Sequence, residues 1–518
     1  MRHFLALFIL LSCLVTFLPG CEPKEDLVQT SGSLTIEQDT VLFDTVFTTV
    51  GTVTKRLWVY NRNSGAVKTD VSLAGLAGAT YSLIINGDQA TSASGVLIRG
   101  NDSMQVLVKA KLGPTGYAGA AKDFLVRDEL HFRTNGNDQL VRLIAYGQNA
   151  YFHRARIISG NVTWPTDKPH VIINKDTLIG TDLVPIGVYV LRGSTLNIPP
   201  GARIYCHAGA TLQVDGTLLV GQGLNPAPGT EVPDSSAARV LFRGDRLESF
   251  YDDIPGQWGG IVFAPTSSGN RISYTEIKNA TFGVSIINVG PDADYSSPPD
   301  VTLANTTIRN ISGSNPAYVG SVYPPGGIVS LSGRVVATNC LLTNCGEYAV
   351  LGVGQSNINL NFCTVANYTP SFNRKTSALT FDGTKPDEAG VILPLTVRIS
   401  NSIIWGSIED ELYWEGFANP SFNYTININN SILRTKDYAD NPSQFNTRSD
   451  RPNQMGADAD PKFKRTPLNS FNRFDYRLDT LSPASNKPFF SPLERYDLVN
   501  KARDLTMPDL GAYERVNP

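Results

Sequence analysis

Two basic side chains, Lys278 and Arg309, occupy matching positions in two copies of a short repeated pattern. If the copies stack, both cations reach one place on an outer face. A lyase that cleaves uronate-containing glycans needs such groups, because a base removes the proton next to a carboxylate while a cation neutralises that carboxylate. The same two side chains also suit a solvated face, where their long stems shield the surface beneath. Both interpretations stay open, and Lys278 and Arg309 are the lyase candidates.

A second group follows Trp405, in the stretch GlySerIleGluAspGluLeuTyrTrpGluGlyPhe. Aromatic faces beside carboxylates suit sugar rings, which offer CH patches and hydroxyl groups. We predict a loop here that binds a ligand. Its candidate residues are Tyr413, Trp414, Phe417, Glu411 and Glu415. The alternative is that Trp414 and Phe417 cover the protein's own core.

Metal-ligand patterns are absent from the chain. Cys340 and Cys345 lack CxxC spacing and a nearby histidine, so we expect no zinc site. We interpret the cysteines as buried thiols that replace small hydrophobic residues. No acidic cluster has the spacing of a calcium loop, so we expect no metal and no cofactor, with Ca²⁺ relevant only to a lyase.

The residues that position these groups belong to a pattern that returns six times between Arg271 and Thr435. A column of small residues comprises Thr275, Thr306, Cys340, Cys363, Ser402 and Ser431. Two places on, an aliphatic column comprises Ile277, Ile308, Leu342, Val365, Ile404 and Leu433, and two places further lie Asn279, Asn310, Asn344 and Asn367. Period-two alternation points all three columns inward, and a repeat of this length is typical of a solenoid. We therefore predict a parallel β-helix, with Asn305, Asn339, Asn401 and Asn430 at a bend.

Several stretches resemble right-handed β-helix proteins of the pectate-lyase-like superfamily. They are the run from Thr195 to Gly221, GlyGlnTrpGlyGlyIleValPhe from Gly256, LeuSerProAlaSer from Leu481 and AspLeuGlyAlaTyrGlu from Asp509. The resemblance covers residues 184–518 and implies the fold, but one fold hosts many activities. The GlyHisGly and ArgIleLys motifs of the polygalacturonases are absent, and so are the pectin methylesterase motifs.

The first residues are typical of an export signal, because Arg2 and His3 precede an apolar run that is too short to span a membrane. The run is followed by LeuProGlyCys, which resembles the lipobox of bacterial lipoproteins and implies a lipid on Cys21; LeuLeuSerCys, ending at Cys13, is the competing site. The next residues, GluProLysGluAsp, resemble the surface-export signal of Bacteroidota lipoproteins, although a solvated linker would look the same. We expect a lipid-anchored protein in the outer membrane, exposed at the cell surface.

Residues 31–151 alternate with period two between AsnSerGly and AsnGlyAsn turns, which predicts a β-sandwich that resembles Ig-like modules. The expected all-β organisation is a signal peptide (1–20), an acidic tether (21–30), an Ig-like β-sandwich (31–151), a connector (152–183), a right-handed parallel β-helix (184–450) and an irregular C-terminal cap (451–518).

One outward column of the repeat turns apolar toward its end: Glu276, Thr307, Leu341, Thr364, Ile403 and Ile432. Water disfavours such a face, so another part of the chain should cover it. We predict that the tail from about Met455 does so, with Phe463, Phe471, Phe474, Tyr476, Phe489 and Phe490.

The near-balanced net charge of −3 gives no sign of nucleic-acid binding. The first functional expectation is a surface-anchored, non-catalytic β-helix lipoprotein that binds glycan or a partner protein at the outer membrane. The second is a polysaccharide lyase that acts on uronate-containing glycans. The third is a structural subunit of an outer-membrane protein assembly.

Overall fold

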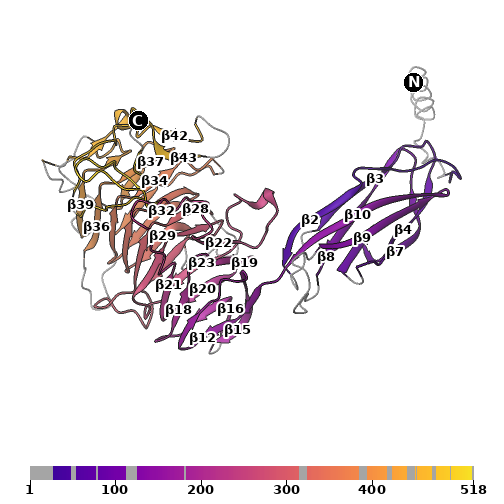
Figure 1. The fold of residues 1–518 in the computed structure, drawn as a ribbon, viewed down its shortest axis with the longest axis horizontal. Helices are drawn as coiled ribbons and strands as arrows, with labels where there is room; N and C mark the ends of the chain where they lie inside the picture. The colour runs from indigo at the N-terminus through magenta and orange to yellow at the C-terminus, as the bar shows by residue number, and fades with distance from the viewer. Residues whose placement is uncertain are drawn as a thin grey trace, which may run out of the picture. The chain divides into compact units, whose positions relative to one another are not determined.

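The computed structural model describes residues 27–47, 54–77, 80–112, 125–179, 182–313, 324–370, 372–383, 394–416, 423–439, 450, 452–468, 474–490 and 492–515. The signal peptide, Cys13, Cys21, Phe417 and Phe471 lie outside these ranges. The chain divides into two compact units, Met1–Asn149 and Ala150–Pro518, and both are built from strands (Figure 1).

The first unit is a sandwich-like pair of mainly antiparallel sheets. One contains, in spatial order, β1 (Thr35–Ile36), β3 (Lys55–Asn61), β8 (Asp102–Ala110), β5 (Tyr81–Ile85) and β6 (Asp88–Ala90). The other contains β2 (Thr40–Phe47), β10 (Asn137–Gln148), β9 (Leu125–Thr134), β4 (Val67–Leu73) and β7 (Ser92–Ile98). Alternate side chains such as Leu57, Val106 and Phe132 are fully buried in one core, as the period-two pattern predicted.

The second unit is a parallel β-helix with three long sheets. Sheet I contains β11 (Tyr151–Arg154), β14 (His170–Ile173), β19 (Arg203–Cys206), β22 (Val240–Gly244), β25 (Thr275–Lys278), β28 (Thr307–Ile311), β31 (Leu341–Cys345), β34 (Thr364–Asn367), β37 (Ile403–Gly406), β40 (Ile432–Leu433) and β41 (Gln454–Met455). Sheet II contains β12 (Arg156–Ile158), β17 (Val188–Val190), β20 (Thr211–Val214), β23 (Gly260–Phe263), β26 (Val284–Ile287), β29 (Gly326–Leu331), β32 (Tyr348–Val353), β35 (Leu379–Asp382) and β38 (Leu412–Trp414). Sheet III contains β13 (Asn161–Thr163), β18 (Thr195–Ile198), β21 (Thr217–Val220), β24 (Asn270–Ser273), β27 (Asp300–Ala304), β30 (Arg334–Thr338), β33 (Asn357–Asn361), β36 (Leu395–Ser400) and β39 (Tyr424–Asn429).

The predicted columns are stacked. On sheet I, Ile277 pairs with Ile308, which pairs with Leu342, and the register continues through Val365 and Ile404 to Leu433. The same register aligns the small column, whose members are at most 1% exposed. The four cysteines of the second unit are buried free thiols, as interpreted.

Three of the asparagines form a ladder at a corner of the coil and do not point inward as predicted, since Asn310 and Asn344 line a cleft on the outer face. Asn310 Nδ2 donates to Asn279 Oδ1 (3.3 Å), and Asn344 Nδ2 donates to Asn310 Oδ1 (2.8 Å). All three have φ between +51° and +63°, a left-handed conformation that asparagine tolerates. Asn367 differs, because its amide exchanges hydrogen bonds with the backbone of Cys345.

The coils begin earlier than the expected start at residue 184. Strands β11, β12 and β13 already pair in parallel with β14, β17 and β18, so residues 152–183 contain coil rather than a connector. An antiparallel hairpin, β15 (Lys175–Ile179) and β16 (Asp182–Ile186), is inserted there. The repeated pattern does not reveal this coil because Tyr151 and His170 take the place that Ile204 has in the aliphatic column. The rings of His153, Trp164 and His170 stack on one another there.

These rings make the first coil sensitive to acid. His170 Nε2 lies 2.7 Å from the carbonyl oxygen of Pro165 and donates to it, so His170 Nδ1 accepts from His153 Nε2 at 2.9 Å. Burial and then the neighbouring His170 lower the pKa of His153 to about 3, and burial lowers the pKa of His170 as well. Both imidazoles are therefore neutral in the folded coil at neutral pH.

We expect the second unit to lose stability as the pH falls. Below the ordinary histidine pKa of 6.5, the unfolded chain takes up protons that the folded coil does not. Between about pH 7.5 and 4.5 the contribution of His153 should fall by about 2–3 kcal/mol. Denaturant titrations at both pH values measure this loss. His153→Phe keeps a ring beside Trp164 and should show a smaller pH dependence; an unchanged dependence would contradict the assignment.

The C-terminal segment covers the apolar outer face of sheet I, as predicted. Leu341, Ile403 and Ile432 are at most 6% exposed and pack in one cluster with residues of the tail. Those tail residues include Phe463, Tyr476, Leu478, Leu510 and Ala512. The hairpin of β42 (Phe463–Arg465) and β43 (Asp475–Leu478) belongs to this cover, while Phe489 and Phe490 are half-buried.

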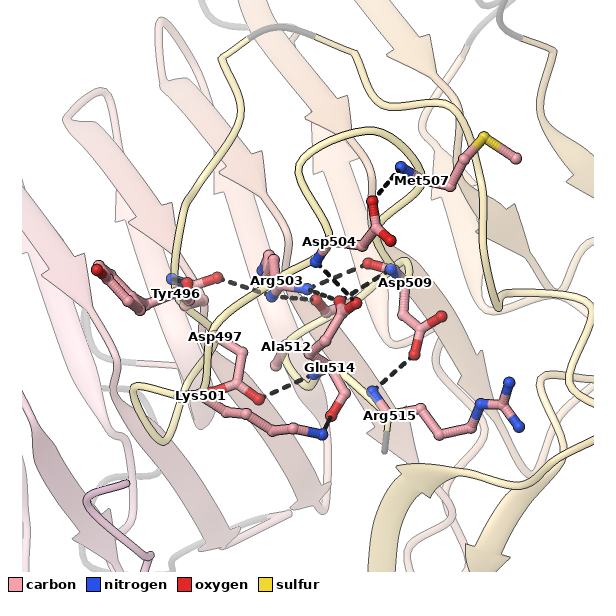
Figure 2. Close-up of polar contacts among 12 residues, drawn as sticks. Tyr496, Asp497, Lys501, Arg503, Asp504, Met507, Asp509, Ala512, Glu514 and Arg515 are labelled. Atoms are coloured by element: carbon pink, nitrogen blue, oxygen red, sulfur yellow. Dashed lines mark hydrogen bonds and ion pairs between the residues drawn. The ribbon is translucent and has the colours of Figure 1, made fainter. Parts of the chain in front are cut away.

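Part of the tail, residues 488–490 and 492–500, follows the bend between sheets III and I; we call it the strap. Corner side chains donate to its carbonyl oxygens: Asn430 to Pro488 (2.6 Å), Asn401 to Phe490 (2.7 Å), Asn361 to Pro492 (3.1 Å), Asn339 to Tyr496 (2.8 Å) and Asn305 to Asp497 (2.6 Å). The strap leads into a polar cluster around Arg503 and Glu514 (Figure 2). The tail is thus attached along several coils.

Candidate functional site

The aromatic and acidic stretch near Trp405 is partly a strand rather than the predicted loop. Its strand β38 is the last rung of sheet II, where Leu412 pairs with Leu379 and Tyr413 with Thr380. The sequence carries this signal, because GluLeuTyrTrpGluGly at 411–416 repeats the pattern AlaLeuThrPheAspGly at 378–383. Period two then divides the candidate residues between the interior and the surface.

Glu411 and Trp414 lie in the interior. Trp414 is 2% exposed and stacks on Phe381 with ring centroids 4.5 Å apart. Glu411 is fully buried, with Oε1 2.7 Å from Arg374 Nη2 and Oε2 accepting from the backbone of Ala378 at 3.0 Å. Burial raises the pKa of Glu411, and Arg374 opposes that rise. Both side chains therefore organise the last coils and are not available to a ligand.

Tyr413 and Glu415 face outward. Tyr413 is 43% exposed, and its hydroxyl donates to Glu415 Oε2 at 2.8 Å. This bond raises the pKa of Tyr413. Both residues line a hollow of about 520 Å³ on the outer face of sheet II, within the usual range of small-ligand sites. Its other lining residues are Tyr348, Leu351, Val353, Lys375, Thr376, Ser377, Thr380 and Asp382.

The hollow combines an aromatic face with hydrogen-bonding groups of both kinds. Asp382 and Glu415 provide carboxylate acceptors, whereas Lys375 provides a donor. Asp382 and Thr380 were not among the candidates, although their place beside Tyr413 follows from the repeated six-residue pattern. This arrangement can bind a polar ring by stacking and hydrogen bonding.

Lys278 and Arg309 are neighbours on sheet I, as their matching positions predicted. Arg309 is held by two carboxylates, with Nε 2.6 Å from Glu276 Oε1 and Nη1 2.6 Å from Asp253 Oδ1. Lys278 is 7% exposed, and burial, followed by Arg309, lowers its pKa. These two residues lie on a different sheet from Tyr413, so the structure does not unite the two candidate groups.

Burial pushes the pKa of Glu276 upward, but Arg309 and Lys278 outweigh it and the net pKa is lowered. Glu276 is therefore a carboxylate that keeps Arg309 engaged. Within the described ranges, no three His, Cys, Asp or Glu side chains gather as a metal site. No helix in the same ranges is long and apolar enough to cross a bilayer.

Comparisons with known proteins give no family assignment. No family model matches the sequence, and no curated protein matches it. A PapD-like domain of human CEP192 is 14% identical, covering 23% of this chain and 87% of that domain, with a TM-score of 0.16. A family 123 glycoside hydrolase from Clostridium perfringens is 10% identical, covering 23% of this chain and 26% of the hydrolase, also with a TM-score of 0.16. At such TM-scores neither likeness supports an argument about this chain.

Proposed function

We propose that this chain is a surface-anchored, non-catalytic lipoprotein that binds glycan on the outer face of sheet II. The observation that carries the proposal is the exposed Tyr413 ring, whose hydroxyl is fixed by Glu415 above a hollow lined with polar groups. In this proposal Cys21 bears the lipid, and an Ig-like first unit connects the outer-membrane anchor to a right-handed β-helix.

The charges of the hollow favour a neutral, hydroxyl-rich sugar. Its lining contains two carboxylates, Asp382 and Glu415, but only one cation, Lys375. They accept hydrogen bonds from sugar hydroxyl groups but repel the carboxylate of a uronate. An aromatic ring such as Tyr413 offers a broad apolar face to the CH side of a pyranose.

The lyase alternative finds little support in the contacts of its two candidates. Arg309 is already neutralised by Glu276 and Asp253, so a substrate carboxylate would have to displace one of them. Lys278 is almost fully buried, and a base must come within hydrogen-bond reach of the proton it removes.

A glycan array followed by calorimetry tests the proposal. We expect neutral glycans to bind, and Tyr413→Ala or Glu415→Gln to weaken the best ligand at least about tenfold, equivalent to about 1.4 kcal/mol. Both side chains are exposed, so the unfolding midpoint should hardly change. Thr425→Ala, at an exposed position of sheet III, is the matched control. The proposal is refuted if both variants bind the glycan as tightly as the parent chain, or if no neutral glycan on the array binds. If the chain captures outer-membrane proteins instead, a structural role is favoured.

A further inference from the structure

A larger cleft, of about 800 Å³, lies over the outer face of sheet I beside the C-terminal hairpin. Thr307, Arg309 and Asn344 contribute to it from the β-helix, whereas Phe474 and Arg477 come from the tail. Its volume is within the range of about 300–1,000 Å³ that is usual for small-molecule sites. The cleft therefore exists only because the tail is packed against the solenoid.

Two buried oxygens in the lining of this cleft have no hydrogen-bond partner among the described residues. They are Thr307 Oγ1 and Asn344 Oδ1, on residues that are 5% and 8% exposed. A buried polar atom without a partner typically costs about 1–3 kcal/mol. A ligand that supplies a donor would remove this cost.

Asn344 Oδ1 lacks a hydrogen-bond donor for a specific reason. Each earlier amide oxygen of the asparagine ladder accepts from the next coil, so Asn279 is satisfied by Asn310 and Asn310 by Asn344. The next coil provides Asn367, but its amide is occupied by the backbone of Cys345. The ladder thus ends at the cleft with an unused acceptor.

The charged groups of the cleft nearly cancel. The lining contains three guanidinium groups and four carboxylates. The former belong to Arg309, Arg465 and Arg477, and the latter to Asp234, Asp253, Glu276 and Asp475. Arg309 uses Nε and Nη1 for its two carboxylates, and Arg477 uses Nε and Nη2 for Asp475. Among the described residues this leaves Arg309 Nη2 and Arg477 Nη1 as available donors. The cleft offers donors and acceptors without the large net charge that would select an ion.

We propose that this cleft is a second binding site and that it takes a neutral saccharide unit of one or two rings. A sugar hydroxyl donates to Asn344 Oδ1, another exchanges a hydrogen bond with Thr307 Oγ1, and Arg309 Nη2 donates to a third. The half-buried ring of Phe474 offers an apolar face at the edge. This site is separate from the hollow at Tyr413 and does not depend on binding there.

The test removes the first site and then perturbs the second. The full chain carrying Tyr413→Ala is purified in mild detergent and titrated with the methyl glycosides of glucose, galactose, mannose and N-acetylglucosamine and with their β-linked disaccharides, using ligand-observed NMR. We expect at least one of these probes to bind. Adding Thr307→Val should weaken its binding at least fivefold and also raise the unfolding midpoint, because the orphan hydroxyl is gone.

Ser285→Ala is the matched control. Ser285 Oγ is also buried without a partner among the described residues, but Ser285 is on sheet II and does not line the cleft. The control should raise the midpoint without weakening binding. The proposal is overturned if no probe binds in the Tyr413→Ala chain, or if Thr307→Val binds as tightly as its parent. It is also overturned if the cleft captures a peptide that the sugars do not displace.

Discussion

Replacing Arg503 by methionine is expected to lower the free energy of unfolding of the second unit by about 3–5 kcal/mol. The Arg503 side chain is fully buried, and its guanidinium carbon lies 4.3 Å from the ring centroid of Phe362. Its Nη2 donates to Asn339 Oδ1 (3.0 Å) and to the Gly511 carbonyl (2.8 Å), and its Nη1 lies 3.4 Å from Glu514 Oε2 (Figure 2). One cation thus connects a corner of the β-helix, the end of the tail and a buried carboxylate.

The loss is large because the partners remain. Methionine fills similar space, but among the described residues it leaves Glu514 with only the backbone N–H groups of Asp504 and Asp509 as donors. A buried carboxylate that has lost its cation is costly. Arg477→Met is the control, since Arg477 is 55% exposed and its pair with Asp475 should contribute less than about 1 kcal/mol. Denaturant unfolding of both variants measures the difference. An Arg503→Met chain as stable as the Arg477→Met chain would show that the cluster does not hold the tail.

Gly511→Ala should destabilise the same contact by about 3–4 kcal/mol. Gly511 has φ +86°, and a Cβ there would lie 2.5 Å from Thr364 Oγ1 and 2.9 Å from Ile403 Cδ1. Relieving this clash moves Ala512, whose amide donates to Thr364 Oγ1 at 2.9 Å. The tail would then separate from the apolar outer face of sheet I.

Gly223→Ala separates backbone strain from the steric clash. Gly223 has φ +94°, but a Cβ there meets nothing within 4 Å, so only strain of about 1–2 kcal/mol is expected. Binding of a hydrophobic dye provides a second readout, because only Gly511→Ala should expose Ile403 and Ile432. Equal stability losses in the two variants, without dye binding, would contradict the close packing at Gly511.

The β-helix was predictable because stacking places like residues one above another. The columns at Thr275 and Ile277 already contain the register of sheet I. The outward column becomes apolar between Glu276 and Ile432, which indicated that the tail covers this face. The first coil escaped prediction because aromatic and imidazole rings take the place of aliphatic side chains at the start of sheet I. Because this arrangement of rings is not repeated in the later coils, it produces no recurring sequence pattern.

The candidate site was predictable only in part. Alternation alone separates the inward Trp414 from the outward Tyr413, once the stretch is recognised as a rung rather than a loop. The burial of Glu411 depends on Arg374, which lies in an irregular segment without any repeat. The cleft over sheet I was beyond prediction for the same reason, since Phe474 and Arg477 belong to the irregular tail.

Binding of a sugar by the outer face of sheet II is tested most directly by a crystal structure of the chain with its best neutral glycan. We predict a pyranose ring stacked on Tyr413, with hydroxyl groups bonded to Asp382 and Glu415. A bound glycan that leaves sheet II untouched would contradict this assignment.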